Sequence, residues 1–142
     1  MQTSQRPENL PTAPRPNVRW LQRPLRTRYL ADPPSAQVID HAASSPLDNG
    51  DPFHALVRPK GLDDAIRVAV HVKHGGPQDG PTPGDLLCAS LSVCYELTIR
   101  MAANHLGLVI ERLEVEAHGE VDLRGSLGMG GQVGFQAMPP TA

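Results

Sequence analysis

The sequence is poor in aromatic residues, in cysteine and in net charge. Aromatic residues are only 4% of the 142 residues, which disfavours a stacking surface for bases or sugars. A formal net charge of −2 provides no strong field that would attract nucleic acid, and we expect no nucleic-acid partner. No apolar run follows a basic amino terminus, so we expect no secretory signal and a cytoplasmic location.

The chain length and the two cysteines set further limits. A chain of 142 residues is sufficient for one domain with a core. Residues 1–18 are polar and rich in proline, so we expect a disordered tail, followed by a single domain over residues 19–142. The arginines near the amino terminus are typical of a solvated arm or of a strand with charged edges. The two cysteines allow a disulfide, a metal pair, or a reactive thiol beside an unreactive one.

The stretch from Gly75 to Gly107, GGPQDGPTPGDLLCASLSVCYELTIRMAANHLG, predicts a turn followed by one long helix. Thr82 is a good N-cap, Pro83 suits the first helical position, and Asp85 completes a capping box. Gly107 can adopt the left-handed conformation that ends a helix.

Apolar residues lie almost all the way round this predicted helix, which is typical of a helix buried in a core. Three charged residues, Asp85, Glu96 and Arg100, interrupt the apolar run, so we expect no membrane span.

Alternating apolar and polar residues predict strands on both sides of the helix. We expect two short strands in residues 25–43 around a turn at Asp32, Pro33 and Pro34, and further strands at residues 53–57, 66–73, 109–121 and 133–138. Strands, then a long helix, then strands indicate an α+β domain with a mostly antiparallel sheet wrapped on the central helix.

No strong metal or cofactor motif is present. His71 and His74 have no companion cysteine or acid at ligand spacing, so we expect no metal site. The run GGPQDGPTPGD lies before a helix amino end but lacks the lysine of a phosphate-binding loop, and its prolines remove N–H donors. We interpret it as a rigid turn and expect no cofactor.

Helix geometry separates the two cysteines. Cys88 and Cys94 are six residues apart, a rise of about 9 Å that leaves their side chains on different faces, so an intact helix cannot join them in a disulfide. We interpret Cys88 as a packing residue. Cys94 is either a packed thiol or a reactive one, and a thiolate at neutral pH would need a cation from elsewhere, because an apolar surround raises a thiol pKa.

The segment GGPQDGPTPGDLLCASLSVCYELTIRMAANHLGLVIERLEVEAHGEVDLRGSLG resembles the central part of the OsmC/Ohr family, the osmotically inducible and organic hydroperoxide resistance proteins. The pattern is GG, GP and P before a leucine-rich helix, a cysteine eleven residues after Pro83, then GL and V-G-VD-RG-LG. The resemblance implies an intertwined homodimer around the central helix and a thiol-dependent peroxidase that acts on organic hydroperoxides. It implies that Cys94 is the peroxidatic cysteine and that an external dithiol is the reductant.

The resemblance also suggests partners for the thiol. Arg28 and Arg58 are candidates for the cation that activates Cys94. Gly84 stands where the hydroperoxide-resistance branch has a glutamate, so Asp85, one position further on, is a candidate acid. The family's C-terminal part with its resolving cysteine has no counterpart in this sequence, which is expected of a truncated or split member or of one completed by a partner. The alternative function is a non-catalytic dimerisation module in which Cys94 is a packed thiol.

Overall fold

The computed structural model describes residues 16–141 of the chain, so the predicted tail lies almost entirely outside the described residues and its boundary stays a prediction. The described part is an α+β arrangement with one long helix and antiparallel strand pairs, as predicted. Its helical elements are α1 (Val18–Ala31), η1 (Pro33–Ala36), η2 (Val72–His74), α2 (Pro83–His105) and α3 (Leu123–Ser126). Its strands are β1 (Ala42–Pro46), β2 (His54–Pro59), β3 (Ile66–Ala69), β4 (Glu116–Ala117), β5 (Glu120–Val121), β6 (Phe135–Ala137) and β7 (Pro140–Thr141).

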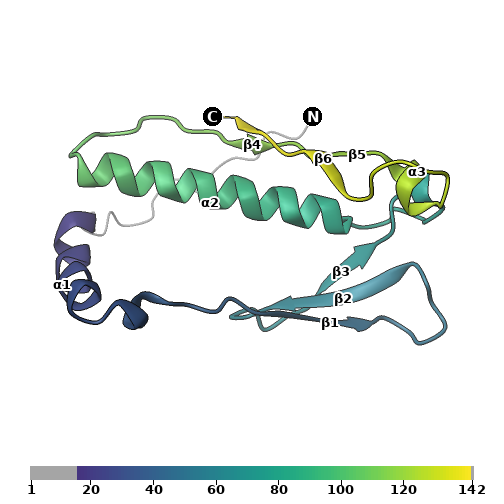
Figure 1. Cartoon of the computed structure of the whole chain (residues 1–142), viewed down its shortest axis with the longest axis horizontal. Helices are drawn as coiled ribbons and strands as arrows, with labels where there is room; N and C mark the ends of the chain where they lie inside the picture. The colour runs from purple at the N-terminus through teal and green to yellow at the C-terminus, as the bar shows by residue number, and fades with distance from the viewer. Residues whose placement is uncertain (1–15, 142) are drawn as a thin grey trace, which may run out of the picture.

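The elements form two layers joined near the amino end of α2 (Figure 1). One layer is the antiparallel sheet β1–β2–β3, with β2 in the centre. The other layer is α2 with the short pairs β4–β7 and β5–β6 along it. The strands predicted at residues 53–57, 66–73 and 133–138 are therefore present, although β3 and β6 are shorter than expected.

The prediction of two strands in residues 25–43 is wrong, because residues 25–31 belong to α1 and residues 33–36 to η1. Asn17 caps the helix by accepting a hydrogen bond from the Trp20 N–H. Apolar residues recur at helical spacing along it, and Pro24 is tolerated inside it. A strand begins only at Ala42, after the predicted turn has become a short 3-10 helix.

The single long strand predicted at residues 109–121 is also wrong. Only two residue pairs of this stretch are extended and paired, β4 with β7 and β5 with β6. Leu108 and Val109 before them are exposed. A strand requires hydrogen bonds from a neighbour, and within residues 16–141 the structure supplies no neighbour for residues 108–115.

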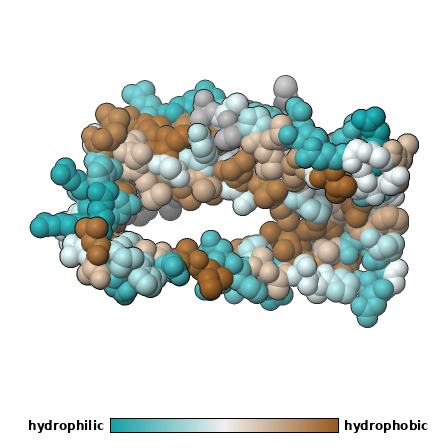
Figure 2. Space-filling view, viewed as in Figure 1, coloured by the Kyte–Doolittle hydropathy of each residue, from teal (hydrophilic) through white to brown (hydrophobic). Residues whose placement is uncertain are grey.

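α2 begins and ends where predicted, but the expected burial is not found within one chain. Gly107 adopts the left-handed conformation (φ +74°) directly after the helix, and the Leu108 N–H donates to the Ala103 carbonyl. Of the α2 residues, only Ala103 is buried. Val93 and Leu97 each keep 53% of their surface exposed, because the β1–β2–β3 sheet lies away from the helix. Figure 2 shows the opening between the two layers.

By length and composition, α2 would also suffice to cross a membrane, and it is the one such helix among residues 16–141. The charged residues that we expected to rule this out are therefore not decisive. A core helix of an assembled globular protein has the same composition. Glu96 and Arg100 form an ion pair of 2.6 Å on α2, which is typical of a helix that reaches water.

Candidate functional site

The amino end of α2 is fixed by reciprocal hydrogen bonds between Thr82 and Asp85. The Asp85 N–H donates to Thr82 Oγ1 (3.2 Å), and the Thr82 N–H and hydroxyl both donate to Asp85 Oδ2 (2.8 Å each). The backbone and side-chain hydrogen bonds from Thr82 hold the pKa of Asp85 below its usual value. The predicted capping box is present, and it engages the Asp85 carboxylate.

The structure does not bring Asp85 to Cys94. The two residues are nine positions apart on one continuous helix, which places them about 13.5 Å apart along the axis and on opposite sides of it. Asp85 is therefore a capping residue within this chain, and its sequence-based role as an acid beside the thiol has no geometric support here.

Cys94 lies near the middle of α2 as a free, exposed thiol. Its carbonyl oxygen accepts a hydrogen bond of 2.8 Å from the Thr98 hydroxyl, a contact of the helix surface. Within the described residues, no group donates a hydrogen bond to the Cys94 sulfur. The sulfur is therefore open to a solute or to a second molecule, and the helix itself supplies no activating group.

Neither arginine proposed as the activating cation contacts Cys94 in this chain. Arg28 lies in the last turn of α1, where its guanidinium stacks 5.1 Å from the ring centre of Tyr29. Arg58 is exposed on β2, opposite Ala43 of β1. Both belong to elements outside the α2 layer (Figure 1).

Cys88, by contrast, lines a hollow of about 1060 Å³ at the amino end of α2. Its walls come from the segment after β3, the first turns of α2, the region from β4 to α3, and β6, and include Val70, His71, Asp85, Val121, Arg124 and Phe135. The contacts on one side are tight: a Cβ added to Gly119 would lie 2.4 Å from Phe135 Cε1 and 3.2 Å from Cys88 Sγ. Cys88 is half-buried and free, and it lies on the same continuous helix as Cys94.

The described residues contain no group of three histidine, cysteine or acidic side chains that could hold a metal ion. His71 Nδ1 instead accepts a hydrogen bond from the Lys73 N–H, and so caps the short helix η2. His71 and His74 thus belong to a turn.

One polar cluster, which consists of Asp51, His54, Arg67 and Asp79, was not predicted from the sequence. Asp51 and His54 are only three residues apart, but Arg67 and Asp79 come from β3 and from the loop before α2, so no short spacing connects them to that pair. The one available signal was the Asn49-Gly50 turn, which places Asp51 just before β2.

The fold and the site together define an α+β protein whose long, capped helix carries a free thiol on its surface. Residues 75–138, just under half of the chain, match the family model described as OsmC-like protein. This segment belongs to the OsmC family, as the resemblance predicted, and it contains α2 with both cysteines. No curated protein matches the chain.

Proposed function

We propose that the chain is a thiol-dependent peroxidase that reduces organic hydroperoxides through Cys94, in cytoplasmic defence against oxidative stress. OsmC membership of residues 75–138 supports a stress-related role of this kind at the level of the family. The observation that carries the proposal is the position of Cys94. It lies in the matched segment, eleven residues after Pro83, on a helix whose register the capping box fixes, and its thiol is free and exposed.

The proposed chemistry begins with the thiolate form of Cys94. Its sulfur attacks one peroxide oxygen, the O–O bond breaks, and the alkoxide leaves and takes up a proton. Cys94 becomes a sulfenic acid. One thiol of an external dithiol then attacks the Cys94 sulfur and releases water, and its second thiol closes the reductant's disulfide and restores the Cys94 thiol. Each cycle therefore reduces one hydroperoxide and oxidises one dithiol.

Activation of the thiol requires a cation near the sulfur, and we propose that a homodimer supplies it. Within one chain, Arg28 and Arg58 lie on elements outside the α2 layer. The apolar surface of α2 around Val93 and Leu97 is uncovered. A second copy that covers this surface would bring its own Arg28 or Arg58 near Cys94. The cation would then come from the partner.

The alternative is a non-catalytic module in which α2 only forms a dimer core and Cys94 packs as an inert thiol. The absence of a cation on the Cys94 sulfur within residues 16–141 favours this alternative. It differs from the peroxidase in one property, namely whether the sulfur reacts with hydroperoxide.

The test is consumption of t-butyl or cumene hydroperoxide by the full chain with a lipoyl-type dithiol. We expect Cys94→Ser to reduce the rate to that of the mixture without protein. Cys88→Ala is the matched control, and we expect it to retain most of the activity. Equal rates for wild type and Cys94→Ser would contradict the proposal, and loss of activity in Cys88→Ala alone would transfer the role to the thiol in the hollow.

A further inference from the structure

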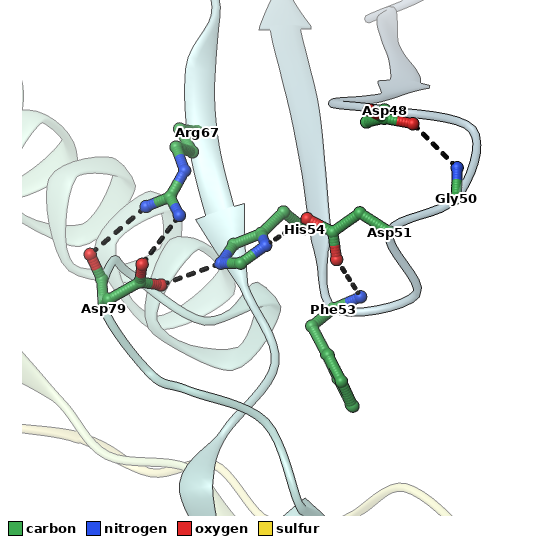
Figure 3. Close-up of polar contacts among 7 residues, drawn as sticks. All are labelled: Asp48, Gly50, Asp51, Phe53, His54, Arg67 and Asp79. Atoms are coloured by element: carbon green, nitrogen blue, oxygen red, sulfur yellow. Dashed lines mark hydrogen bonds and ion pairs between the residues drawn. The ribbon is translucent and has the colours of Figure 1, made fainter.

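His54, at the start of β2, has a carboxylate against each of its ring nitrogens (Figure 3). Its Nδ1 lies 2.5 Å from Asp51 Oδ2, and its Nε2 lies 2.9 Å from Asp79 Oδ1. An ionised carboxylate can only accept, so each contact requires an N–H on the ring. The ring is therefore an imidazolium, and since neither nitrogen is free, His54 cannot act as a general base.

The two carboxylates are themselves held in place. Arg67 of β3 donates to Asp79 Oδ2 (2.7 Å) and to the Asp79 carbonyl oxygen (3.4 Å). Asp51 accepts a hydrogen bond of 2.8 Å from the Phe53 N–H. The His54 side chain is only 12% exposed between them. The cluster thus links the β1–β2 loop, two strands and the loop before α2.

The loop before α2 runs back along the end of β3. The Ala69 N–H donates to the Pro81 carbonyl (3.0 Å), and the Gln78 N–H donates to the Val70 carbonyl (3.1 Å). Gln78 has φ +48°, a conformation uncommon for a residue with a Cβ, and it directly precedes Asp79. The Gln78 Oε1 also accepts a hydrogen bond of 3.1 Å from the Val72 N–H. Asp79 is therefore the charged anchor of a loop that holds one strained residue.

We infer that protonated His54 is a positioning residue, a latch that holds the loop of residues 76–81 against the β1–β2–β3 sheet and releases it on deprotonation. Residues on both sides of this loop, His74 before it and Thr82 after it, line the hollow beside Cys88. Release of the loop therefore changes one wall of the hollow and the approach to the amino end of α2. The latch does not depend on the thiol chemistry proposed above.

The charges facing His54 give the direction of the pH dependence. The hydrogen bond to Asp79 and then that to Asp51 raise the pKa of His54, and burial and the Arg67 charge oppose them. Arg67 and then His54 lower the pKa of Asp79 to about 2. A raised histidine pKa means that the latch contributes fully below the ordinary value of 6.5 and is lost as the pH rises through the raised value. The latch is therefore closed in mildly acidic solution and opens as the pH rises through the raised pKa of His54.

The experiment is an NMR titration of the full chain that follows the histidine Cε1 protons and the backbone N–H groups of the loop, which belong to Gly76, Gln78, Asp79 and Gly80. We expect the His54 midpoint to lie above the ordinary histidine value of 6.5, and the Gln78 amide to shift and lose hydrogen-exchange protection with that midpoint. Asp79→Asn should lower the His54 midpoint toward the ordinary value and remove the loop protection already at pH 6, about where the wild-type latch is closed.

Two controls complete the design. His41→Gln, at an exposed histidine before β1, should leave the loop amides and the His54 midpoint unchanged, and Asp79→Glu should restore part of the shift. A His54 midpoint at or below the ordinary value of 6.5 would overturn the inference, and so would a Gln78 amide that stays protected while His54 titrates. The wild-type titration decides the question alone if Asp79→Asn does not fold.

Discussion

At the scale of the residue, Gly119 shows how closely the wall of the hollow is packed. The residue lies between β4 and β5, and its missing side chain leaves the space that the Phe135 ring occupies beside Cys88. A Cβ at 2.4 Å from the ring would be an overlap that only a movement of Phe135 or of the backbone could relieve. Glycine is therefore required at position 119, because the Phe135 ring lies too close to the backbone for a Cβ.

We predict that Gly119→Ala lowers the free energy of unfolding by about 1–3 kcal/mol, the usual cost of overpacking. Gly50→Ala is the matched control, because the added Cβ would meet only the Asp48 carboxylate at 3.6 Å, an ordinary contact. Urea unfolding, monitored by circular dichroism, measures the free energy of unfolding of both variants. Equal midpoints for the two variants would show that Phe135 does not pack against Gly119.

The cap of α2 gives a second prediction at this scale. Thr82→Ala removes the side-chain acceptor of the Asp85 N–H and should cost about 1 kcal/mol. In the wild type, the lowered pKa of Asp85 adds stability above the usual aspartate value of 3.8, and this stability is lost as the pH falls through the lowered pKa. Thr98→Ala is the control, since its hydroxyl bonds only to the Cys94 carbonyl on the helix surface and alanine is the better helix former. A loss as large in Thr98→Ala as in Thr82→Ala would contradict the role of the cap.

At the scale of the element, one side chain joins α1 to α2. Asn104 in the last turn of α2 accepts a hydrogen bond of 2.9 Å from the Val18 N–H and donates one of 2.9 Å to the Pro16 carbonyl. No α1 residue is buried, so these two bonds contribute much of what fixes the helix in place.

We predict that Asn104→Ala raises hydrogen exchange throughout α1 and leaves the β1–β2–β3 sheet unchanged. The reason is that α1 lacks a buried face, so loss of its tether permits local unfolding. Asn49→Ala, in the turn between β1 and β2, is the control and should leave exchange in α1 as it is. Unchanged protection of α1 in Asn104→Ala would show that the helix is held by other contacts.

The element scale also shows what the sequence could predict. The start and end of α2 follow from Thr82, Asp85 and Gly107, because caps are local chemistry. α1 was missed because Pro24 and the arginines obscured an amphipathic pattern. The strand expected at residues 109–121 is mostly absent, because alternation indicates a half-buried strand but not whether a neighbouring strand is present. The His54 cluster depends on the fold, which brings Arg67 and Asp79 to the local pair of Asp51 and His54.

At the scale of the whole molecule, the chain exposes more surface than a compact protein of its size. Its accessible surface is 11943 Å², whereas about 7,100 Å² is expected for a folded monomer of 15.3 kDa. Even a fully extended segment of residues 1–15 would account for only about 2,400 Å² of the excess. About 2,400 Å² of excess accessible surface then remains on each chain, and burial of this area on two chains is in the range of an obligate homodimer interface.

We therefore predict a dimer in solution, formed through the exposed apolar surface of α2. Leu97→Asp places a charge on this surface and should give a monomer or an unfolded chain in analytical ultracentrifugation. Ser92→Asp, on the face of α2 that carries Glu96, is the matched control and should remain dimeric. A wild-type chain that stays monomeric at micromolar concentration would contradict the proposed assembly and the supply of a cation by the partner.

The central claim is that Cys94 is the sulfur that hydroperoxide oxidises, and one measurement tests it without any reductant. The reduced full chain is treated with one equivalent of cumene hydroperoxide in the presence of dimedone, which traps sulfenic acid, and its peptides are analysed by mass spectrometry. We predict a dimedone adduct on the peptide that contains Cys94, at a rate well above that of Cys88. Trapping at Cys88 alone, or at neither cysteine, would contradict the assignment.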